Sequence, residues 1–364
     1  MSTLTYKCPA CGAPLAYDGR QNEMTCGNCG NTFDPKTIQA VNEIRREDEG
    51  FEDMSWRMED RGFTEGDLSQ TRTYSCSSCG AQLITEATTV ATSCAFCGSP
   101  SVIPEQFSPG TRPQKLLPFI VGKAEAETMF RDYFKKRKLI PNLFYKGPLE
   151  IKEIRQLYAP FWLFGCLADA RMTYRASTSM AHRSGNYLIT TTRHFLLRRA
   201  GTLRFRDLPV DASQRLDNKI TESIEPFRND DAIDFIPQAL SGAQANAADL
   251  RPEDCQERAN ERVRTSTDQA FRETTRGYGA VVPQSSSIQL RDASAVPVLC
   301  PMWIITTMKE GKLYTFAING QTGRLTCDIP WSKAKFIGRL FGVGLGAAAA
   351  GLIAVFALAR FGVL

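Results

Sequence analysis

The pattern of apolar and polar residues predicts several elements in the middle of the chain. An apolar segment, 118–121, precedes a predicted helix over residues 123–138. A second helix is predicted over residues 252–275, which are rich in glutamate, arginine and alanine. Residues 186–206 alternate in polarity and are rich in threonine, phenylalanine and leucine. This alternation predicts a pair of antiparallel strands.

A further hairpin is predicted near the end of the same region. Residues 313–318 form an apolar run, Asn319-Gly320 supplies a turn, and residues 324–327 form the returning strand. Separated helices and antiparallel hairpins are typical of the α+β class. We therefore predict an α+β domain with an antiparallel sheet over residues 105–332.

The last part of the chain contains a long uncharged stretch. Residues 340–359 include neither a charge nor a proline, and a helix of this length spans roughly 30 Å, the thickness of the hydrocarbon core of a bilayer. We therefore predict a basic flank and a single C-terminal transmembrane helix within residues 333–364. Lys333, Lys335 and Arg339 precede the uncharged stretch, so the positive-inside rule predicts a cell-membrane protein whose N-terminal bulk is cytoplasmic.

Cysteines dominate the N-terminal part of the sequence. Of the 12 cysteines, eight form four Cys-x-x-Cys pairs, and each cysteine of the first set recurs 68 residues later in the second set. This repeat predicts two copies of one module, at residues 1–34 and 72–104. A glycine follows the second cysteine of every pair, and glycine accepts the positive φ that a sharp metal-binding turn needs. The predicted ligands are Cys8, Cys11, Cys26 and Cys29 in the first module and Cys76, Cys79, Cys94 and Cys97 in the second.

Four thiolates at this spacing are typical of a zinc ribbon. They close a tetrahedral site with no position left for water, so the Zn²⁺ ion stabilises the module and performs no chemistry. We predict two Zn²⁺ ions per chain. An iron centre or a redox dithiol is the alternative, although a redox Cys-x-x-Cys usually occurs singly within a βαβ pattern. Residues 1–11 contain no apolar stretch typical of a signal peptide, which favours a reducing compartment.

The charge of the modules bears on their partners. Residues 4–34 have a net charge of −1 and residues 72–104 a net charge of zero. The connector between them, residues 35–71, is acidic and is predicted to be helix-prone. A phosphate-binding surface needs clustered lysine and arginine, so protein contact or scaffolding is favoured over nucleic-acid binding. The chain as a whole is only slightly basic, with Lys+Arg 44 against Asp+Glu 39.

No catalytic constellation is apparent. The two histidines, His182 and His194, have no carboxylate or cysteine spaced to join them, so we predict surface or hydrogen-bonded histidines. The four remaining cysteines lie in apolar runs and are predicted to be small core residues; they are Cys166, Cys255, Cys300 and Cys327. No phosphate-binding G-x-x-x-x-G-K-[ST] motif occurs. We therefore predict that the protein is not an enzyme.

Eight arginines and no acidic residue occur within residues 171–206. A solvated face of a sheet is one interpretation of this pattern. A surface for anionic lipid or for an acidic partner is the other.

Together these features resemble a bacterial family of membrane-anchored proteins with two zinc ribbons. The family is described as TFIIB-type zinc-ribbon proteins, and sometimes as primosomal-helicase-like. The segments that carry the resemblance are the two modules, Ala159–Leu163, Pro209–Ser213, Ile224–Phe227, Leu240–Gly242, Pro301–Trp303 and, most distinctively, Phe316–Gly323. The helicase description is not supported, because the motor motifs are missing.

The resemblance implies a role but no reaction. Some relatives lie beside phage-shock protein A and flotillin/prohibitin-like proteins, which implies an anchor that recruits such partners in membrane stress. We therefore expect a non-enzymatic, zinc-binding adaptor that is anchored in the membrane and binds cytoplasmic or membrane-associated proteins. A membrane-tethered regulator that binds nucleic acid is the competing hypothesis.

Overall fold

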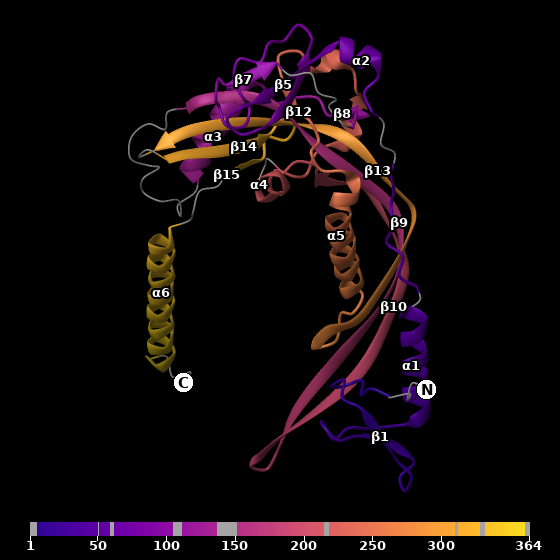
Figure 1. The fold of residues 1–364 in the computed structure, drawn as a ribbon. Helices are drawn as coiled ribbons and strands as arrows, with labels where there is room; N and C mark the ends of the chain where they lie inside the picture. Colours follow the sequence, from indigo (N-terminus) through magenta and orange to yellow (C-terminus); the bar gives the residue numbers. More distant parts are fainter. Residues whose placement is uncertain are drawn as a thin grey trace. The chain divides into compact units, whose positions relative to one another are not determined.

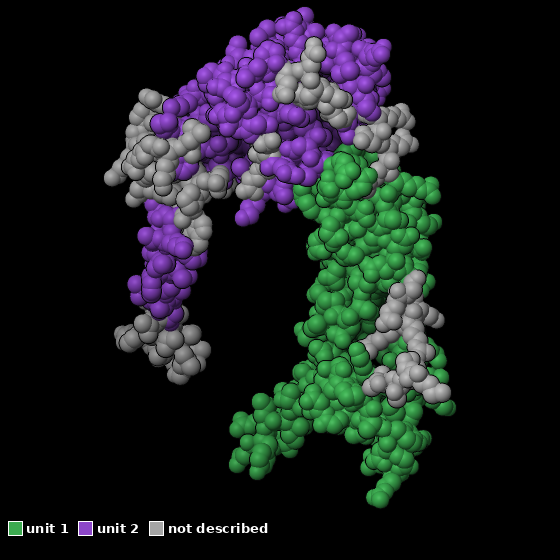
Figure 2. All heavy atoms as spheres, viewed as in Figure 1, with its two compact units in different colours: residues 1–59, 162–210, 251–296 green, residues 60–161, 211–250, 297–364 purple. Residues whose placement is uncertain are grey.

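The structure is a computed structural model, and the chain divides into two compact units, each built from three segments (Figure 2). Unit 1 comprises residues 1–59, 162–210 and 251–296, and unit 2 comprises residues 60–161, 211–250 and 297–364. The residues that the structure describes are 6–49, 51–58, 62–104, 111–136, 151–214, 218–309, 312–327 and 332–360. The predicted domain boundaries stay predictions.

The first cysteine module forms a small sheet of its own. Strands β1 (Leu15–Asp18), β2 (Glu23–Cys26) and β3 (Thr32–Phe33) pair antiparallel in the order β1-β2-β3. A turn at residues 19–22 joins the first two of these strands. Helix α1 (Pro35–Glu49) follows and occupies the start of the connector that was predicted to be helix-prone.

Among the described residues, a second sheet has twelve strands, with the order β11-β8-β13-β9-β12-β6-β5-β7 along its main path. Figure 1 shows its long strands β9, β10 and β13. Its strands are β4 (Arg57–Met58), β5 (Thr71–Cys76), β6 (Gln82–Glu86), β7 (Val102–Pro104), β8 (Lys115–Leu116), β9 (Ile151–Ser184), β10 (Tyr187–Asp211), β11 (Ile233–Asp234), β12 (Gln244–Asn246), β13 (Ala280–Lys309), β14 (Lys312–Asn319) and β15 (Leu325–Cys327). The helices that accompany it are α2 (Glu65–Ser69), α3 (Lys123–Lys136), α4 (Asn218–Ser223), α5 (Pro252–Glu273), α6 (Lys333–Arg360) and the short 3₁₀ helices η2 (Asn229–Asp231) and η3 (Pro237–Leu240).

The prediction of an α+β fold with an antiparallel sheet is wrong, because this sheet is mixed. Strand β12 runs parallel to β9, and β8 and β4 run parallel to β13. These added strands have only two or three residues each and come from segments far away in the sequence. Strands this short leave no hydrophobic pattern, so their direction could not be predicted from the sequence.

The long strands also differ from the expected hairpin at residues 186–206. The turn lies earlier, between Ser184 and Tyr187, where Gly185 has a φ of 60°. Gly201, which lies inside the predicted range, is part of the extended strand β10. The hairpin of β14 and β15 is confirmed, with Phe316 opposite Cys327. Helices α3 and α5 confirm the two predicted helices, although residues 137 and 138 lie outside the described residues.

Unit 1 is held together by contacts between the connector, β9 and α5. The Trp56 ring packs edge-on against Phe164 with ring centroids 4.9 Å apart. The indole N–H of Trp56 donates to Asn260 Oδ1 at 2.7 Å, and Asn260 is itself buried. The connector therefore contributes core residues to this unit, and the buried polar pair fixes how it packs.

The largest aromatic core of unit 2 lies between α3 and the strands β13 and β14. Phe130 and Phe134 of the helix pack against Phe316, with centroid distances of 4.8 and 5.7 Å. Trp303 belongs to the same cluster, and its indole N–H donates to the carbonyl of Val121 at 2.9 Å. This bond fixes the entry of the chain into α3.

The predicted transmembrane helix is contradicted by α6. Of the helices in the described part of the chain, none combines the length and the apolar character that a membrane crossing requires. The side chains are described for residues 333–351 of α6. Three cations, Lys333, Lys335 and Arg339, lie in its first two turns, and much of the rest is glycine and alanine, whose small side chains carry little apolar surface. The predictions of a membrane anchor, of a single-pass cell-membrane location and of the orientation based on it are therefore withdrawn.

Candidate metal centres

The four Cys-x-x-Cys turns have the same backbone geometry. In each turn the first cysteine accepts a backbone hydrogen bond from the glycine four residues later, at N–O distances of 2.7–3.0 Å. The φ angles of these glycines are 78°, 71°, 71° and 75° for Gly12, Gly30, Gly80 and Gly98. Residues with a side chain rarely adopt this conformation. The glycines noted in the sequence are therefore required by the turns.

The turns bring the eight predicted ligands together in two groups of four. The groups are Cys8, Cys11, Cys26 and Cys29, and Cys76, Cys79, Cys94 and Cys97; within each group all Sγ atoms lie within 4.8 Å of one another. Pairs across the first group are 3.7 and 3.4 Å apart, and pairs across the second group are both 3.7 Å apart. A disulfide would require about 2.05 Å, so these are groups of free thiols.

The spacing fits a tetrahedral ion. Zinc–sulfur bonds of about 2.3 Å place neighbouring sulfurs in a tetrahedron about 3.8 Å apart, close to the separations found. Each cluster can therefore bind one metal ion, and zinc is the ion that four thiolates at this distance favour. Each of the eight predicted ligands belongs to one of the two groups, and no cysteine is shared between them.

The protein environment makes the thiols within a group unequal. Burial raises the pKa of the Cys8 thiol to about 12 and also raises the pKa of the Cys94 thiol. A backbone hydrogen bond at Ala13 is the main cause that lowers the pKa of the exposed Cys11 thiol to about 6. A cation that binds all four as thiolates must displace protons from the buried ones, so metal affinity should fall as pH falls.

The second group lies in the core of its module. Cys76 and Cys94 are fully buried and pack with Tyr74 and Leu83. The module is also joined to the main sheet of unit 2, since β6 pairs with β12 through Ile84 opposite Ala245. The strands that carry the second cysteine group therefore belong to the main sheet of unit 2.

Side chains from β9 and β12 hold the last cysteine turn of the second module. The Gln244 amide accepts from the N–H of Ala95 at 3.0 Å and donates to the carbonyl of Ser93 at 2.8 Å. The Arg155 guanidinium donates to the carbonyl of Ala95 at 2.9 Å and forms an ion pair with Glu153. A Cβ at Gly98 would lie 2.5 Å from Arg155 Nη2, so any other residue here would have to displace the guanidinium in addition to adopting a positive φ.

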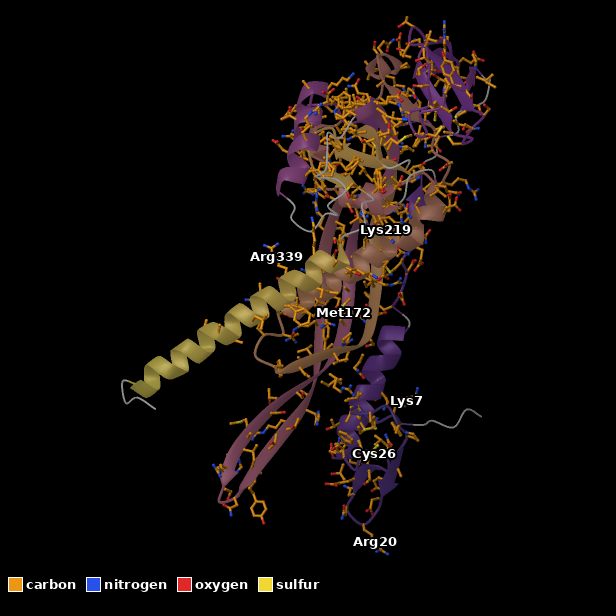
Figure 3. All side chains as sticks on the ribbon, turned by 90° about the vertical axis from the view of Figure 1, so that its left-hand side faces the viewer. Lys7, Arg20, Cys26, Met172, Lys219 and Arg339 are labelled. Atoms are coloured by element: carbon orange, nitrogen blue, oxygen red, sulfur yellow. The ribbon has the colours of Figure 1, made fainter. Side chains whose placement is uncertain are left out.

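The first module is more open to solvent. Cys8 and Cys26 are buried, but Cys11 and Cys29 are exposed. Figure 3 labels Cys26, the last residue of β2, within the module. An arginine of β9 holds one of its turns too, because Arg175 donates to the carbonyl of Ala10. In each module, therefore, an arginine of β9 binds a carbonyl within a cysteine turn.

Other residues singled out in the sequence lie apart from the metal groups. Cys166, Cys255 and Cys300 are buried, as predicted, whereas Cys327 is half-buried with its sulfur 3.2 Å from the Tyr133 hydroxyl. His182 and His194 are exposed on β9 and β10.

The eight arginines of residues 171–206 have different environments. Arg171 lies over the Phe51 ring, and Arg199 donates to Thr274, so these two contribute to packing in unit 1. Five are exposed, and they are Arg183, Arg193, Arg198, Arg204 and Arg206.

Sequence reasoning missed the residues that hold the modules in place. Arg155, Arg175 and Gln244 lie 60 to 165 residues away from the turns they bind. No spacing rule links residues that far apart. Only the paths of β9 and β12 bring them to the cysteines.

Comparison with known proteins gives one full-length relative. The chain is 30% identical over 345 residues to the "Uncharacterized protein YdjG" of Bacillus subtilis (strain 168), and the match covers 94% of this chain and 95% of that protein. The chain belongs to the YdjG family. Because the match covers 94% of this chain, family membership concerns nearly its whole length. No family model and no solved structure matches the chain.

Proposed function

We propose that this protein is a non-enzymatic adaptor in which each of two ribbon modules is stabilised by one structural Zn²⁺ ion and the rest of the chain presents surfaces to protein partners. The observation that carries the proposal is the closed geometry of the two four-sulfur groups. Four thiolates fill the coordination sphere of zinc and leave no position for water or substrate. Such an ion serves to fold the module that holds it.

The exposed end of the β9–β10 hairpin supports a protein-binding role. Tyr187 is 77% exposed, and Leu188 and Met180 are each 72% exposed. Large apolar side chains at such exposure in a small area are typical of interaction sites. Arg183 and Arg193 lie in the same stretch without an acidic residue, which favours a partner whose surface is apolar with an acidic rim.

Nucleic acid is the competing ligand, and the charge distribution argues against it. Lys7 and Arg20 of the first module lie at opposite ends of it (Figure 3). A strong phosphate contact needs several cations gathered on one face. The ribbons therefore lack the surface that a nucleic-acid reader would use.

The proposal is tested by affinity purification of the full chain from a bacterium that encodes it. Some relatives in the zinc-ribbon family that the sequence resembles lie beside phage-shock protein A and flotillin/prohibitin-like proteins, so these are the partners to look for. The double variant Tyr187→Ser/Leu188→Ser should reduce recovery of the specific partner at least ~5-fold, because apolar anchors carry most of the free energy at an interface.

The matched control is Ile233→Ser, which replaces an exposed apolar residue in unit 2. It should leave recovery of the partner unchanged. Recovery of nucleic acid that is lost when either cysteine module is disrupted would contradict the adaptor proposal. The proposal would also be contradicted if the partner were recovered equally with the wild type, the Tyr187→Ser/Leu188→Ser variant and the Ile233→Ser control.

A further inference from the structure

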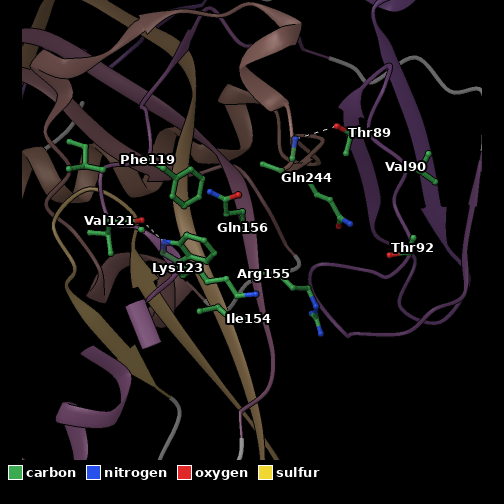
Figure 4. A pocket seen from close by; sticks show the side chains of 15 residues that line it. Thr89, Val90, Thr92, Phe119, Val121, Lys123, Ile154, Arg155, Gln156 and Gln244 are labelled. Carbon is green, nitrogen blue, oxygen red and sulfur yellow. Dashed lines mark hydrogen bonds between the residues drawn. The ribbon is translucent and has the colours of Figure 1, made fainter. Parts of the chain in front are cut away.

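A pocket of about 640 Å³ lies in unit 2, beside the second cysteine module. Thr89, Val90 and Thr92 of that module line one side of it, and the segment from Phe119 to Lys123 lines the other (Figure 4). Between these walls lie residues 154–156 of β9 and residues 242–244, the last of which begins β12. Trp303 completes the lining. The volume is in the range of pockets that bind small molecules.

The lining has a definite chemical character. It contains two cationic side chains, Lys123 and Arg155, and no acidic side chain. The rings of Phe119 and Trp303 are in edge-to-face contact, with centroids 5.4 Å apart, and supply an apolar wall. A site with a cationic part and an aromatic part is complementary to an organic anion.

The two cations differ in their availability. The Arg155 side chain is only 9% exposed, and its charge is balanced by the ion pair with Glu153, so it mainly holds the cysteine turn. Its Nε atom is nevertheless buried without a hydrogen-bond partner among the described residues. The Lys123 ammonium and the Gln156 amide also have no partner in the described part of the chain, and both line the pocket.

The backbone adds a further contribution at the same edge. Lys123 is the first residue of α3, a 14-residue helix, and Gly122 and Lys123 both line the pocket. The first N–H groups of a helix have no intrahelical acceptor and carry a partial positive charge. Anions bind readily at such an end. Glu125 lies in this first turn but does not line the pocket.

We propose that this pocket binds a small organic anion, with its carboxylate or phosphate group at Lys123 and the start of α3 and its apolar part against Trp303 and Phe119. The Gln156 amide supplies a further donor. Because Thr89, Val90 and Thr92 lie between Cys79 and Cys94, the wall that they form belongs to the metal-binding module. Occupancy of the pocket and folding of the second module are therefore linked, and each should stabilise the other.

Four single-ring probes that differ in charge test the proposal on the full-length, zinc-loaded protein. They are phenyl phosphate, benzoate, benzamide and benzylamine, and binding is followed by ligand-detected NMR titration. The two anions should bind about 5- to 10-fold more tightly than benzamide, and benzylamine should bind most weakly, as expected when one ammonium and a helix terminus favour negative charge. The order of phenyl phosphate and benzoate distinguishes a phosphate ligand from a carboxylate ligand.

Two substitutions at Lys123 test whether the anion binds at this residue. Lys123→Ala should weaken anion binding about 5-fold and leave benzamide unchanged, while Lys123→Arg should retain most of the affinity. Alanine is a good helix former, so the start of α3 should be preserved. Lys115→Ala, which removes an exposed lysine of β8 outside the pocket, is the matched control and should bind like wild type.

The proposal would be overturned if all four probes bound with equal affinity, or if none of the four bound. An unchanged affinity for the anions in Lys123→Ala would do the same. None of these outcomes bears on the adaptor role, which is tested at the end of the β9–β10 hairpin in unit 1.

Discussion

Cys94→Ser should remove one of two metal ions and unfold the second module together with the strand pairs that join it to the sheet of unit 2. Cys26→Ser, the equivalent change in the repeat, should remove one ion and unfold the first module alone. A structural zinc ion contributes about 10–16 kcal/mol to the folding of a ribbon-sized peptide. This is as large as the whole net stability of a typical domain, about 5–15 kcal/mol, so we expect neither module to remain folded without its ion.

The two variants should differ in how far the damage extends. Cys94 is fully buried among Tyr74 and Leu83, and the module that holds it pairs with β12. The first module forms a separate three-stranded sheet with two of its four cysteines exposed. Loss of its ion therefore removes little packing outside residues 6–34.

Hydrogen exchange measured by mass spectrometry on the full chain under reducing conditions separates these outcomes. In Cys94→Ser, protection should be lost over residues 71–104 and in β12. In Cys26→Ser, protection should be lost over residues 6–34 and kept in the second module. Loss of protection in both modules in either variant would show that the sites are coupled, contrary to the closed geometry of each group.

Asn319→Ala should lower the free energy of unfolding by about 3–5 kcal/mol, because it leaves several buried backbone groups without partners. The Asn319 side chain is fully buried. Its amide donates to the carbonyls of Ile224 and Pro226 at 2.9 and 3.2 Å, and its carbonyl accepts from the N–H groups of Gln321 and Thr322 at 2.8 and 3.0 Å. One side chain thus joins the β14–β15 turn to the segment that follows α4.

Urea unfolding of the zinc-loaded protein, followed by tryptophan fluorescence, measures this effect. Thr322→Ala in the same turn is the control, since Thr322 is exposed. It should change the free energy of unfolding by less than about 0.5 kcal/mol. A loss below about 1 kcal/mol in Asn319→Ala would mean that the freed backbone groups find other partners, and that Asn319 is not the link between these segments.

The segment Phe316–Gly323 was the most distinctive part of the family resemblance, and its structure explains why. Besides the bonds of Asn319, a Cβ at Gly320 would lie 2.6 Å from Phe119 and 2.8 Å from Pro301. Gly323 has a φ of 71° and lies against Met129. Asn319 and Gly320 are therefore required by contacts with distant parts of the chain, and Gly323 is required by its backbone conformation.

Features that depend on local chemistry could be predicted from the sequence. The metal groups follow from Cys-x-x-Cys pairs with a glycine after each, because every turn is formed by neighbouring residues. Helix α5 and the β14–β15 hairpin follow from local pattern and turn residues. The prediction at residues 340–359 was wrong because it counted the absence of charge and gave too little weight to the many glycines and alanines.

Features that depend on distant contacts could not be predicted. Strand β9 has 34 residues, far beyond a usual strand, and its length follows from pairing with β10, β12 and β13. The positions of Arg155 and Arg175 against the cysteine turns, and of Lys123 and Trp303 around one pocket, depend on that pairing. The two-residue strands β4 and β8 exist only because a long neighbour is present.

The measurement that tests the central claim most directly is the metal content and ligand set of the full-length protein, purified under reducing conditions. Elemental analysis should find two zinc ions per chain. X-ray absorption at the zinc edge should find four sulfur neighbours at about 2.3 Å and no nitrogen or oxygen. One ion or none per chain, iron in place of zinc, or an oxygen neighbour that indicates an open coordination position would contradict the account.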